Sequence, residues 1–580
     1  MARTRLHAAT VEVPLSSLPA AALRAVLREG YNAADLRRDI LAGLVVGVVA
    51  LPLSMALAIA VGAPPQHGLY TAIVGGSIVA LLGGSRTQVT GPTAAFIVIL
   101  APIYTKFGMS GLLMSGLLAG VLLTAMGLFR LGKLIEFIPH PVTTGFTAGI
   151  GTVIATLQLK DLFGLKLTHA APHFLEQVAA MIEANATFSV LEFALGFTTL
   201  LALIYLPRVS RRMPPAPLLA LPLAAIAAWL IHHLHPSLQI ATIDSRFHGI
   251  PQTPPLPILP WTAAGADGIA LPFSFDTLRL LLPGAFAIAM LGAIESLLSA
   301  VVSDGMAGTR HDPDAELLAL GVGNILCPFF GGIPATGAIA RTATNIRSGG
   351  RSPIASVIHA LTVLAAVLVL APLIGYLPMA SLAALLLLVA WNMSDAKHFV
   401  HTLKIAPRSD VAVLLTCFGL TVIFDMVIAV SVGIVLAALL FMRRMAALTE
   451  TKILETGAHP HGAPGPLPHG VLVYDIDGPL FFGAATRAMD ALHAIGDRAK
   501  VVILRLEDVP AIDATGLVAL ESALARLQKD RCLAILCGLS RQPAVALARA
   551  KIVDEADRLL IRADIVSAIE TATQYIGSRK

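Results

Sequence analysis

The chain has 580 residues, of which 56% are hydrophobic and only 13% are charged, and its mean hydropathy is +0.79. Soluble globular proteins carry about 25% charged residues, so this composition excludes a soluble protein and indicates an integral membrane protein. The net charge of +5 does not predict a nucleic-acid partner, because in a membrane protein the placement of positive charges says more than their sum.

Residues 1–34 are interpreted as a retained cytoplasmic segment. Arg24 and Arg28 interrupt the apolar stretch that would have to serve as the core of a signal peptide. A transmembrane domain is expected over residues 35–448, where apolar runs recur within the roughly 20 residues needed to cross a bilayer.

About fourteen membrane spans are predicted from the apolar segments between polar or Pro/Gly breaks. They lie near 39–61, 68–83, 92–105, 109–130, 139–159, 188–206, 216–234, 280–303, 315–327, 337–347, 354–374, 378–392, 409–425 and 427–446. The segments that begin at Pro92 and Gly337 are too short to cross a bilayer alone at about 1.5 Å per residue.

Lys and Arg residues are distributed unevenly between the two sets of connections. If the N-terminus is cytoplasmic, the inner connections carry roughly three times as many of them as the outer ones, which supports that orientation. The outer connections then contain Lys106, Lys160, Lys166, Arg246 and Arg279. An even number of spans places both termini in the cytoplasm.

Two segments combine a glycine pair, a short non-helical stretch and a Thr-Gly step at matching places in the two halves. The first reaches Thr90-Gly91-Pro92-Thr93 in the third span, and the second reaches Thr336-Gly337 in the tenth. Such pairs predict an inverted-repeat transporter with seven spans in each half. The alternative is that the first segment is merely a loop between spans.

Half-helices that begin near the bilayer midplane would direct free N–H groups, and about half a positive charge each, at one point. That point is predicted to be an anion site. Thr90 or Thr93 can cap a half-helix or line the site, and Pro92 fits a first helical turn.

The predicted span 280–303 carries one acid well inside it, Glu295, with Ser299 one turn later on the same face. A carboxylate at that depth is costly unless it faces a cavity or a partner, so Glu295 is a functional candidate. Arg341, one turn into the second half-helix, is its expected partner. Protonation of Glu295 would leave a site charge of about +2, which suits a dianion. An ionised Glu295 could instead hold Na⁺, and a purely structural Glu295–Arg341 ion pair is the alternative.

A Pro/Gly-rich linker is expected over residues 449–469, and a soluble α/β domain with a mostly parallel sheet over 470–580. Strands are predicted to start at Val471, Val501 and Leu533, with helices over 484–495 and 515–529. Asp513 is expected to cap the second of these helices. No Gly-rich phosphate loop is present in the sequence, so ATP-driven pumping has no support.

The four cysteines show no metal-binding spacing, and no metal site is predicted. If Cys532 and Cys537 lie in one strand, their thiols point to opposite faces, which argues against a disulfide. The sequence also shows no catalytic triad or cofactor motif, so it does not predict an enzyme.

Five stretches carry a family resemblance. They are GLVVGVVALPLSMALAIAVGAPPQHGLY, VTGPTAAF, LGAIESLLSAVVSDGM, GGIPATGAIARTATNIRSGGRSP and the C-terminal domain. Together they resemble the SulP family of anion transporters over about residues 30–575. The resemblance implies an all-α polytopic membrane domain of the uracil-permease type, with a seven-plus-seven inverted repeat. A core domain would move against a gate domain in alternating access.

The resemblance further implies a cytoplasmic STAS domain at the C-terminus, a multi-pass place in the cell membrane and a homodimer. A cytoplasmic protein partner of the STAS domain is left open. Phosphorylated soluble STAS relatives carry Ser after the turn Asp, whereas Ala514 follows Asp513 here. Phosphorylation at that position is therefore excluded, and Thr515 is a weaker candidate.

The family's anion site lies between the third and tenth half-helices, which implicates Thr93, Ala94, Gly337 and Ala338 here. Bicarbonate-transporting relatives use an acidic and a hydroxyl residue of the eighth span for sodium, and the matching positions are Glu295 and Ser299. Glu in place of the Asp of those relatives favours a proton. No cofactor is expected beyond H⁺ or Na⁺ as coupling ion.

The sequence therefore predicts secondary active transport of a small inorganic or carboxylic anion by proton- or sodium-coupled symport. Sulfate is the family default, with bicarbonate or a C4-dicarboxylate next. The alternatives are anion exchange without cation coupling, transport of a nucleobase or other uncharged substrate, and a membrane-anchored signalling receptor with the STAS domain as its output. Arg341 argues against an uncharged substrate, and Ala514 and the paired half-helices argue against a receptor.

Overall fold

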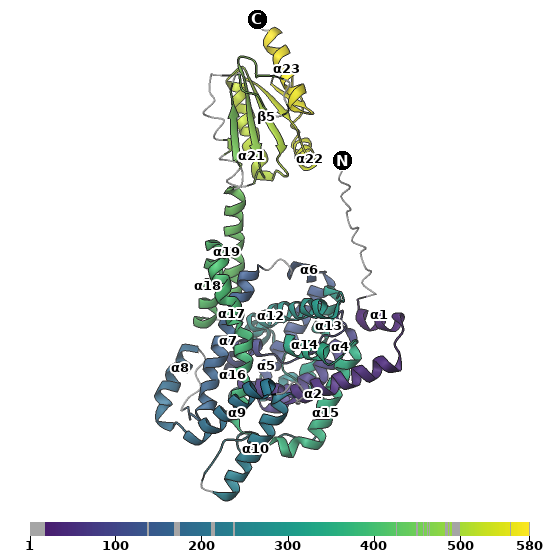
Figure 1. Ribbon diagram of the computed structural model, residues 1–580, viewed down its shortest axis with the longest axis vertical. Coiled ribbons are helices and arrows are strands. Elements are labelled where there is room, and N and C mark those ends of the chain that lie inside the picture. The colour runs from purple at the N-terminus through teal and green to yellow at the C-terminus, as the bar shows by residue number, and fades with distance from the viewer. Residues whose placement is uncertain are drawn as a thin grey trace. The chain divides into compact units, whose positions relative to one another are not determined.

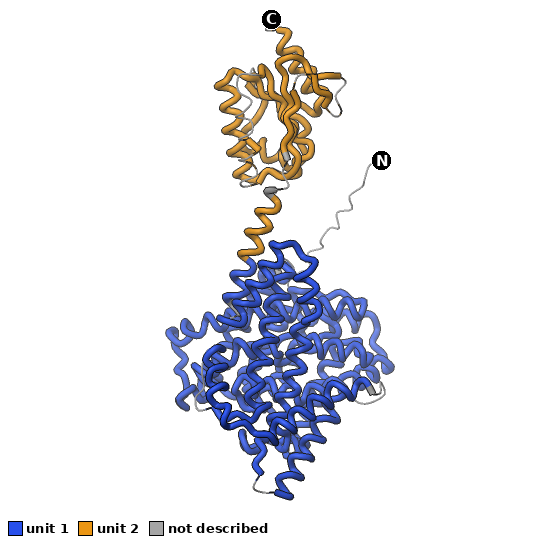
Figure 2. Tube along the Cα trace, turned by 60° about the vertical axis from the view of Figure 1, so that its left-hand side comes forward, with its two compact units in different colours: residues 1–434 blue, residues 435–580 orange. Residues whose placement is uncertain are grey.

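The computed structural model describes residues 18–135, 139–167, 174–209, 215–235, 238–424, 426–447, 450–455, 457–460, 462, 465–481, 485, 488–489, 499–556 and 558–578. The chain divides into two compact units, residues 1–434 and 435–580 (Figure 2). Each unit is described by itself below.

The first unit, the membrane unit, is built of helices (Figure 1). Its long helices are α2 (Ala33–Val61), α5 (Ile97–Leu128), α7 (His140–Leu162), α9 (Val190–Val209), α10 (Ala216–Leu234), α12 (Phe275–Ala307), α15 (Pro353–Ile374), α16 (Met379–Ser394), α18 (Arg408–Ile423) and the first part of α19 (Met426–Ala447). Its shorter helices include α1 (Ala21–Glu29), α3 (Pro65–Tyr70), α4 (Gly76–Leu82), α6 (Gly132–Ile135), α8 (Phe174–Glu183), α11 (Ile243–Phe247), α13 (Pro313–Leu326), α14 (Ile339–Arg347) and α17 (Ala396–Ile405).

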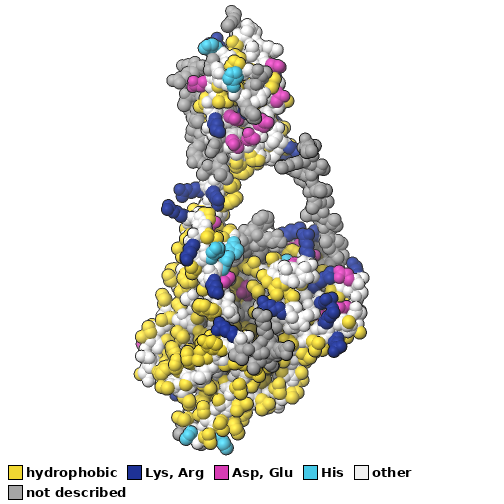
Figure 3. Space-filling view, in the orientation of Figure 1, with side chains coloured by type: hydrophobic (Ala, Val, Ile, Leu, Met, Phe, Trp, Pro, Cys, Tyr) yellow, Lys and Arg dark blue, Asp and Glu magenta, His cyan; other side chains and the backbone are white. Residues whose placement is uncertain are grey.

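Every predicted span overlaps at least one of these helices. Nine helices of the described residues are long and apolar enough to cross a membrane. Hydrophobic side chains cover much of the visible surface of this unit (Figure 3), and large ones such as Leu223 (61% exposed) and Val369 (70%) suit contact with lipid. A polytopic helical domain is therefore confirmed, and the number of spans stays a prediction.

The predicted third and fourth spans form one nearly continuous helical element. The short 3₁₀-helix η3 (Ala94–Phe96) leads into α5, which breaks at Gly108, where φ is +67°. A Cβ at Gly108 would lie 2.2 Å from the carbonyl carbon of Gly265. Glycine is required here by both the left-handed backbone and the close approach of the 264–266 loop.

Helix contacts divide the membrane unit into two groups. In the first group α2 packs against α15, and α5 packs against α12 and α13. In the second group α7 packs against α16 and α18, and α9 packs against α10 and α16. Fewer contacts join the groups, chiefly those of α16 with α2 and η3, of α10 with α2, and of α7 with α5 and η3. A thin boundary between two well-packed bodies is what relative sliding or rocking requires.

Glycines bring α2 and α15 into close contact. A Cβ at Gly43 would lie 2.6 Å from the carbonyl oxygen of Ala355 and 2.7 Å from Cβ of Ile358. A Cβ at Gly47 would lie 2.6 Å from Cβ of Thr362. Small residues let helix backbones approach and gain dispersion contacts, which drive helix association in a bilayer.

The second unit contains a five-stranded mixed sheet in the order β3-β4-β5-β6-β7. Its strands are β3 (Glu450–Leu454), β4 (Val471–Asp477), β5 (Val501–Asp508), β6 (Leu533–Cys537) and β7 (Leu559–Arg562), and its helices include α21 (Ala514–Lys529), α22 (Arg541–Arg549) and α23 (Ile565–Ser578). Strands β4 to β7 pair in parallel, as predicted, and β3 pairs antiparallel with β4.

Strand β3 lies inside the segment 449–469 that is predicted from its Pro/Gly content to be a linker. Residues 450–454 are not part of a linker, because they pair with residues 473–477 and extend the sheet by one edge strand. The predicted helix over 484–495 lies mostly outside the described residues.

The two faces of this sheet bury separate hydrophobic cores. Cys532 belongs to the core under α21, which includes Leu520, and Cys537 belongs to the core under α23, which includes Ala568. The prediction that the two thiols point to opposite faces is confirmed. Burial raises the pKa of each thiol to about 12, so both remain protonated.

Asp513 occupies the N-cap of α21, as predicted. Its carboxylate accepts a hydrogen bond of 2.7 Å from the backbone N–H of Gly516. A side-chain acceptor at this position satisfies one of the N–H groups that a helix start leaves free.

We expect Gly43→Ala to lower the apparent melting temperature of the detergent-solubilised protein. The added methyl group overpacks the α2–α15 contact, at a cost of about 1–3 kcal/mol, and outweighs the gain of about 1 kcal/mol in helix propensity. Gly419→Ala is the matched control, because a Cβ at Gly419 in α18 meets no atom within 4 Å. Equal melting temperatures for the two variants would contradict the proposed tight contact.

We expect Asp513→Ala to destabilise the start of α21 by about 1 kcal/mol, the usual value of a lost N-cap. Asp513→Asn keeps a side-chain acceptor and is expected to retain most of the protection. Hydrogen exchange of the amides around Gly516 in the full chain measures the difference, and equally slow exchange in both variants would rule out the cap as a stabilising contact.

Candidate anion site

Two short strands, one from each half of the membrane unit, meet in its core. Strand β1 (Thr90–Gly91) pairs antiparallel with β2 (Thr336–Gly337), with Thr90 opposite Gly337 and Gly91 opposite Thr336. We call this pair the Thr-Gly crossing. It brings together the two interrupted segments that the sequence places far apart.

A helix start follows each strand of the crossing. Thr93 is the N-cap residue of η3 and Ala338 is the N-cap residue of α14, and none of the described side chains caps either start. Pro92 therefore lies just before the helix, and the prediction that it belongs to the first helical turn is wrong. The uncapped starts leave backbone N–H groups and the positive ends of two helices in one place.

The extended stretch before β1 is held by side chains of the second half. The hydrogen bonds are Gly84 N–H and Ser85 N–H to the Glu316 carboxylate (3.0 and 3.1 Å), Asn345 to the Thr87 carbonyl (2.8 Å), Ser356 to the Gln88 carbonyl (2.7 Å) and Val89 N–H to the Thr342 hydroxyl (3.0 Å). Non-helical backbone at membrane depth is tolerated only where the protein supplies such partners.

The stretch before β2 is held in the same way by the first half and by α13. Asn324 donates to the Ala335 carbonyl at 2.9 Å and accepts from the Ala335 N–H at 2.8 Å. Thr71 donates to the Ile333 carbonyl at 2.9 Å. Asn324 thus replaces the neighbouring strand that this peptide would have in a sheet.

A buried polar chain behind the crossing links these contacts. Gln88 donates from Nε2 to Ser296 and to Glu316, at 2.7 Å in each case, and Glu316 is only 1% exposed. A Cβ at Gly337 would lie 2.5 Å from Nε2 of Gln88, so the crossing requires glycine there. Glu316 and Asn324 are not predicted from the sequence, although polar residues within the predicted span 315–327 are a signal that points to them.

Arg341 lies behind the crossing and is 2% exposed. Its Nη2 donates to the Pro92 carbonyl, and a Cβ at Gly91 would lie 2.5 Å from its Nη1. Gly91 is therefore needed for the guanidinium to lie against β1. Neither Nε nor Nη1 has a hydrogen-bond partner among the described residues. A buried cation with spare donors is costly unless an anion or water completes its contacts.

Glu295 contacts Thr93 directly. The Thr93 hydroxyl donates to Oε2 of Glu295 at 2.8 Å, and both side chains are partly exposed. Within the described residues no Glu295–Arg341 ion pair is formed, so the alternative of a structural ion pair is wrong, and Arg341 is not the hydrogen-bond partner of Glu295. Arg341 donates to the Pro92 carbonyl instead, and the hydroxyl of Thr93 lies beside the acid.

The other predicted site residues are all buried. Ser299 is buried with its Oγ 3.3 Å from Oγ1 of Thr342, and Thr336 donates to the Gly292 carbonyl at 2.8 Å. Thr90 is buried within β1. Ala94, the first residue of η3, and Ala338, the N-cap residue of α14, are each 8% exposed.

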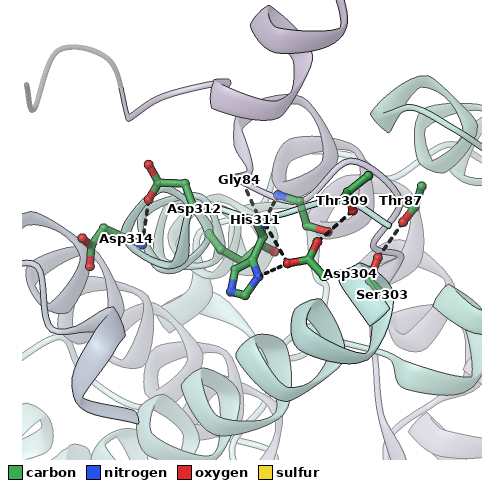
Figure 4. Close-up of polar contacts among 10 residues, drawn as sticks. Gly84, Thr87, Ser303, Asp304, Thr309, His311, Asp312 and Asp314 are labelled. Carbon is green, nitrogen blue, oxygen red and sulfur yellow. Dashed lines mark hydrogen bonds and ion pairs between the residues drawn. The ribbon is translucent and has the colours of Figure 1, made fainter. Parts of the chain in front are cut away.

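A second polar network fixes the connection between α12 and α13 (Figure 4). Asp304 accepts from the hydroxyl of Thr309 at 2.8 Å and from the N–H and Nδ1 of His311 at 2.8 and 2.7 Å. The hydroxyls of Thr87 and Ser303 lie 2.6 Å apart. These contacts hold the end of α12, and thus Glu295, in register with the stretch that leads to β1.

Comparisons with known proteins show the family to which the chain belongs. The family model described as "Sulfate permease family" matches residues 36–417, and the STAS domain model matches residues 466–568. The Bacillus subtilis (strain 168) protein named "Putative sulfate transporter YvdB" is 39% identical over 89% of this chain and 94% of its own length. The bicarbonate transporter BicA of Picosynechococcus sp. is 28% identical over 86% and 88%.

Solved structures of similar fold include murine Slc26a9 in the inward-facing state, with a TM-score of 0.83, 18% identity and coverage of 99% of this chain and 96% of that one. The transmembrane domain of a cyanobacterial BicA gives a TM-score of 0.59 at 27% identity over 70% and 98%. These relatives are membrane transporters and not enzymes. The family match spans most of the membrane unit, and the chain belongs to the sulfate permease family of anion transporters, with a C-terminal STAS domain.

Proposed function

We propose that this protein carries a small inorganic or carboxylic anion across the cell membrane by secondary active transport. The observation that carries the proposal is the Thr-Gly crossing, where two uncapped helix starts meet beside a buried arginine. Sulfate is the first candidate substrate and bicarbonate or a C4-dicarboxylate the next. The names of YvdB and BicA, which give sulfate and bicarbonate, support this choice.

The charges around the crossing favour an anion. Each helix start contributes about half a positive charge, and Arg341 adds one. An ionised Glu295 removes one and leaves about +1, whereas a protonated Glu295 leaves about +2. Thr93, Ala94 and the backbone of the first turn of α14 would touch the anion, while the side chain of Arg341 would act from behind β1 through its charge.

Glu295 is proposed as the coupling residue. Its carboxylate accepts a hydrogen bond from Thr93 at the start of η3, so its protonation changes the charge and the hydrogen bonding of the anion site together. Anion binding then favours protonation, and protonation favours anion binding to the same extent, because such linkage is reciprocal. Na⁺ held by Glu295 would act through the same charge. Ser299 would contribute to coupling only indirectly, through its contact with Thr342.

Alternating access is proposed to be a movement of the first helix group against the second. Both strands of the crossing and α12 belong to the first group, so the site would move as one body. Both termini are proposed to be cytoplasmic, since the predicted inner connections are rich in Lys and Arg. We further propose a transport domain over 35–448, a STAS domain over 470–580 that contacts a cytoplasmic protein, and a homodimer.

We expect Glu295→Gln to abolish stimulation of anion uptake by the coupling gradient, with a loss of about tenfold or more. The amide cannot take up the proton or match the charge of Na⁺. Uptake of labelled sulfate, bicarbonate and fumarate into proteoliposomes, under separate inward proton and sodium gradients, measures the effect. Glu176→Gln, at an exposed position of α8, is the control.

Unchanged dependence of uptake on pH and sodium in Glu295→Gln would refute coupling through Glu295. The unaltered protein would be identified as an exchanger if its anion uptake requires a counter-anion inside the liposome and does not depend on the proton or sodium gradient. If the unaltered protein takes up no anion, either under a cation gradient or with a counter-anion inside, the result would favour the receptor alternative.

We expect Arg341→Gln to reduce sulfate uptake about tenfold or more, and bicarbonate uptake less, because a dianion loses twice the Coulomb energy. Arg341→Lys keeps the charge and is expected to restore part of the uptake, although a lysine cannot lie flat against Gly91 as the guanidinium does. Arg347→Gln, exposed at the end of the same helix, is the control. Sulfate uptake by Arg341→Gln at the unaltered rate would remove Arg341 from the site.

A further inference from the structure

A cavity of about 380 Å³ lies where α2, α7 and the first part of α5 end. We call it the α5–α7 vestibule. The polar or charged residues among those that line it are Tyr104, Thr105, Gln158, Lys160 and Gln177. Its walls come from both helix groups, because α5 belongs to the first group and α7 to the second.

The first part of α5 connects this vestibule to the candidate anion site. It follows η3, which begins at Ala94 beside the crossing, and it lines the vestibule with Ala101 and Tyr104. Ala101 is seven residues after Ala94, which corresponds to a rise of about 10 Å along a helix. One helix face thus leads from the vestibule to the crossing, and η3 also contacts α7.

The vestibule lies at the end of the membrane unit opposite its basic end. Helix α2 begins at Ala33 and carries Arg37 and Arg38 near its start, and it ends at Val61, next to Gly62 of the vestibule wall. In the proposed orientation the basic end faces the cytoplasm. The vestibule therefore opens toward the outside.

Among the residues that the structure describes, Lys160 is the one charged side chain that lines the vestibule. The adjacent acid, Asp161, is paired with Arg246 at 2.7 Å, and no ion pair of Lys160 is formed within the described residues. Gln158, which is 4% exposed, and the hydroxyl of Tyr104 add neutral hydrogen-bonding groups. Within the described part of the wall, a cation lies beside neutral donors and no acid is present, and this combination suits a hydrated anion.

Lys160 also lies in the last turn of α7, where any cation stabilises a helix end. A purely structural lysine would therefore fit the same position. The two roles differ in their consequence, because only a capture site makes the vestibule select anions over cations.

We propose that the α5–α7 vestibule is an outer capture site for a small inorganic or carboxylic anion, which Lys160 holds before the anion passes along α5 to the Thr-Gly crossing. The inference rests on the proposed function and extends it to a second site. The capture site raises the local anion concentration at the entrance and filters cations there.

The test uses charged thiol reagents on the full-length protein in proteoliposomes. Ala266→Cys places a thiol in the exposed loop that lines the vestibule, and the four native cysteines are buried. The rates of labelling by membrane-impermeant anionic and cationic methanethiosulfonates are compared with Lys160 intact and in Lys160→Gln, Lys160→Arg and Lys166→Gln. Lys166 is the matched control, because it is an exposed lysine nearby that does not line the vestibule.

We expect Lys160→Gln to lower the anionic-to-cationic rate ratio roughly fivefold at low salt, and the difference to shrink at high ionic strength. Lys160→Arg is expected to keep the ratio, and Lys166→Gln to change it little. External sulfate is expected to slow anionic labelling when Lys160 is intact and to lose this effect in Lys160→Gln. The half-saturation concentration for sulfate uptake is expected to rise roughly fivefold in Lys160→Gln.

A ratio that Lys160→Gln leaves unchanged, or that Lys166→Gln lowers equally, would overturn the capture site. Labelling that external sulfate never slows would overturn it as well. If sulfate slows labelling through Lys160 but the unaltered protein takes up no anion, the capture site stands and the proposed transport fails. The two proposals are therefore distinguishable in one set of variants.

Discussion

The membrane unit depends on one constraint, which is that peptide groups without a helical partner must find one inside the protein. The extended stretches on either side of the Thr-Gly crossing meet this constraint through buried side chains from distant spans, above all Glu316 and Asn324. Each unsatisfied peptide group in a bilayer core would cost several kcal/mol. The network therefore fixes where both helix starts lie, and the anion site follows from their position.

The same network explains how the charges of the site are divided. Arg341 is held behind β1 by the Pro92 carbonyl, and Gly91 makes room for it. Glu295 stands at the partly exposed side with Thr93. A cation placed behind the site and an acid placed at its surface leave a net positive field that protonation of the acid can strengthen. Anion binding and cation binding can thus be linked without a direct ion pair between the two residues.

The division into two helix groups allows the anion site to move relative to the rest of the membrane unit. The crossing and its supporting helices α12 to α15 lie in the first group, whereas α7 and α16 face it from the second. The proposed capture site at Lys160 lies where the groups meet. Movement of one group against the other would change the vestibule and the exposure of the crossing together, because α5 forms part of both.

The sequence by itself determined the features that local pattern controls: a polytopic helical domain, the two interrupted segments, the mostly parallel sheet and the cap at Asp513. Hydropathy, helix-breaking residues and capping chemistry act within a few residues, so they are visible in one sequence. Only the tertiary structure decided that Thr93 contacts Glu295, which follows it by 202 residues, that Glu316 supports the crossing, and that residues 450–454 add a strand. Those outcomes depend on which distant segments pack together and where their side chains point, and neither is encoded in local periodicity.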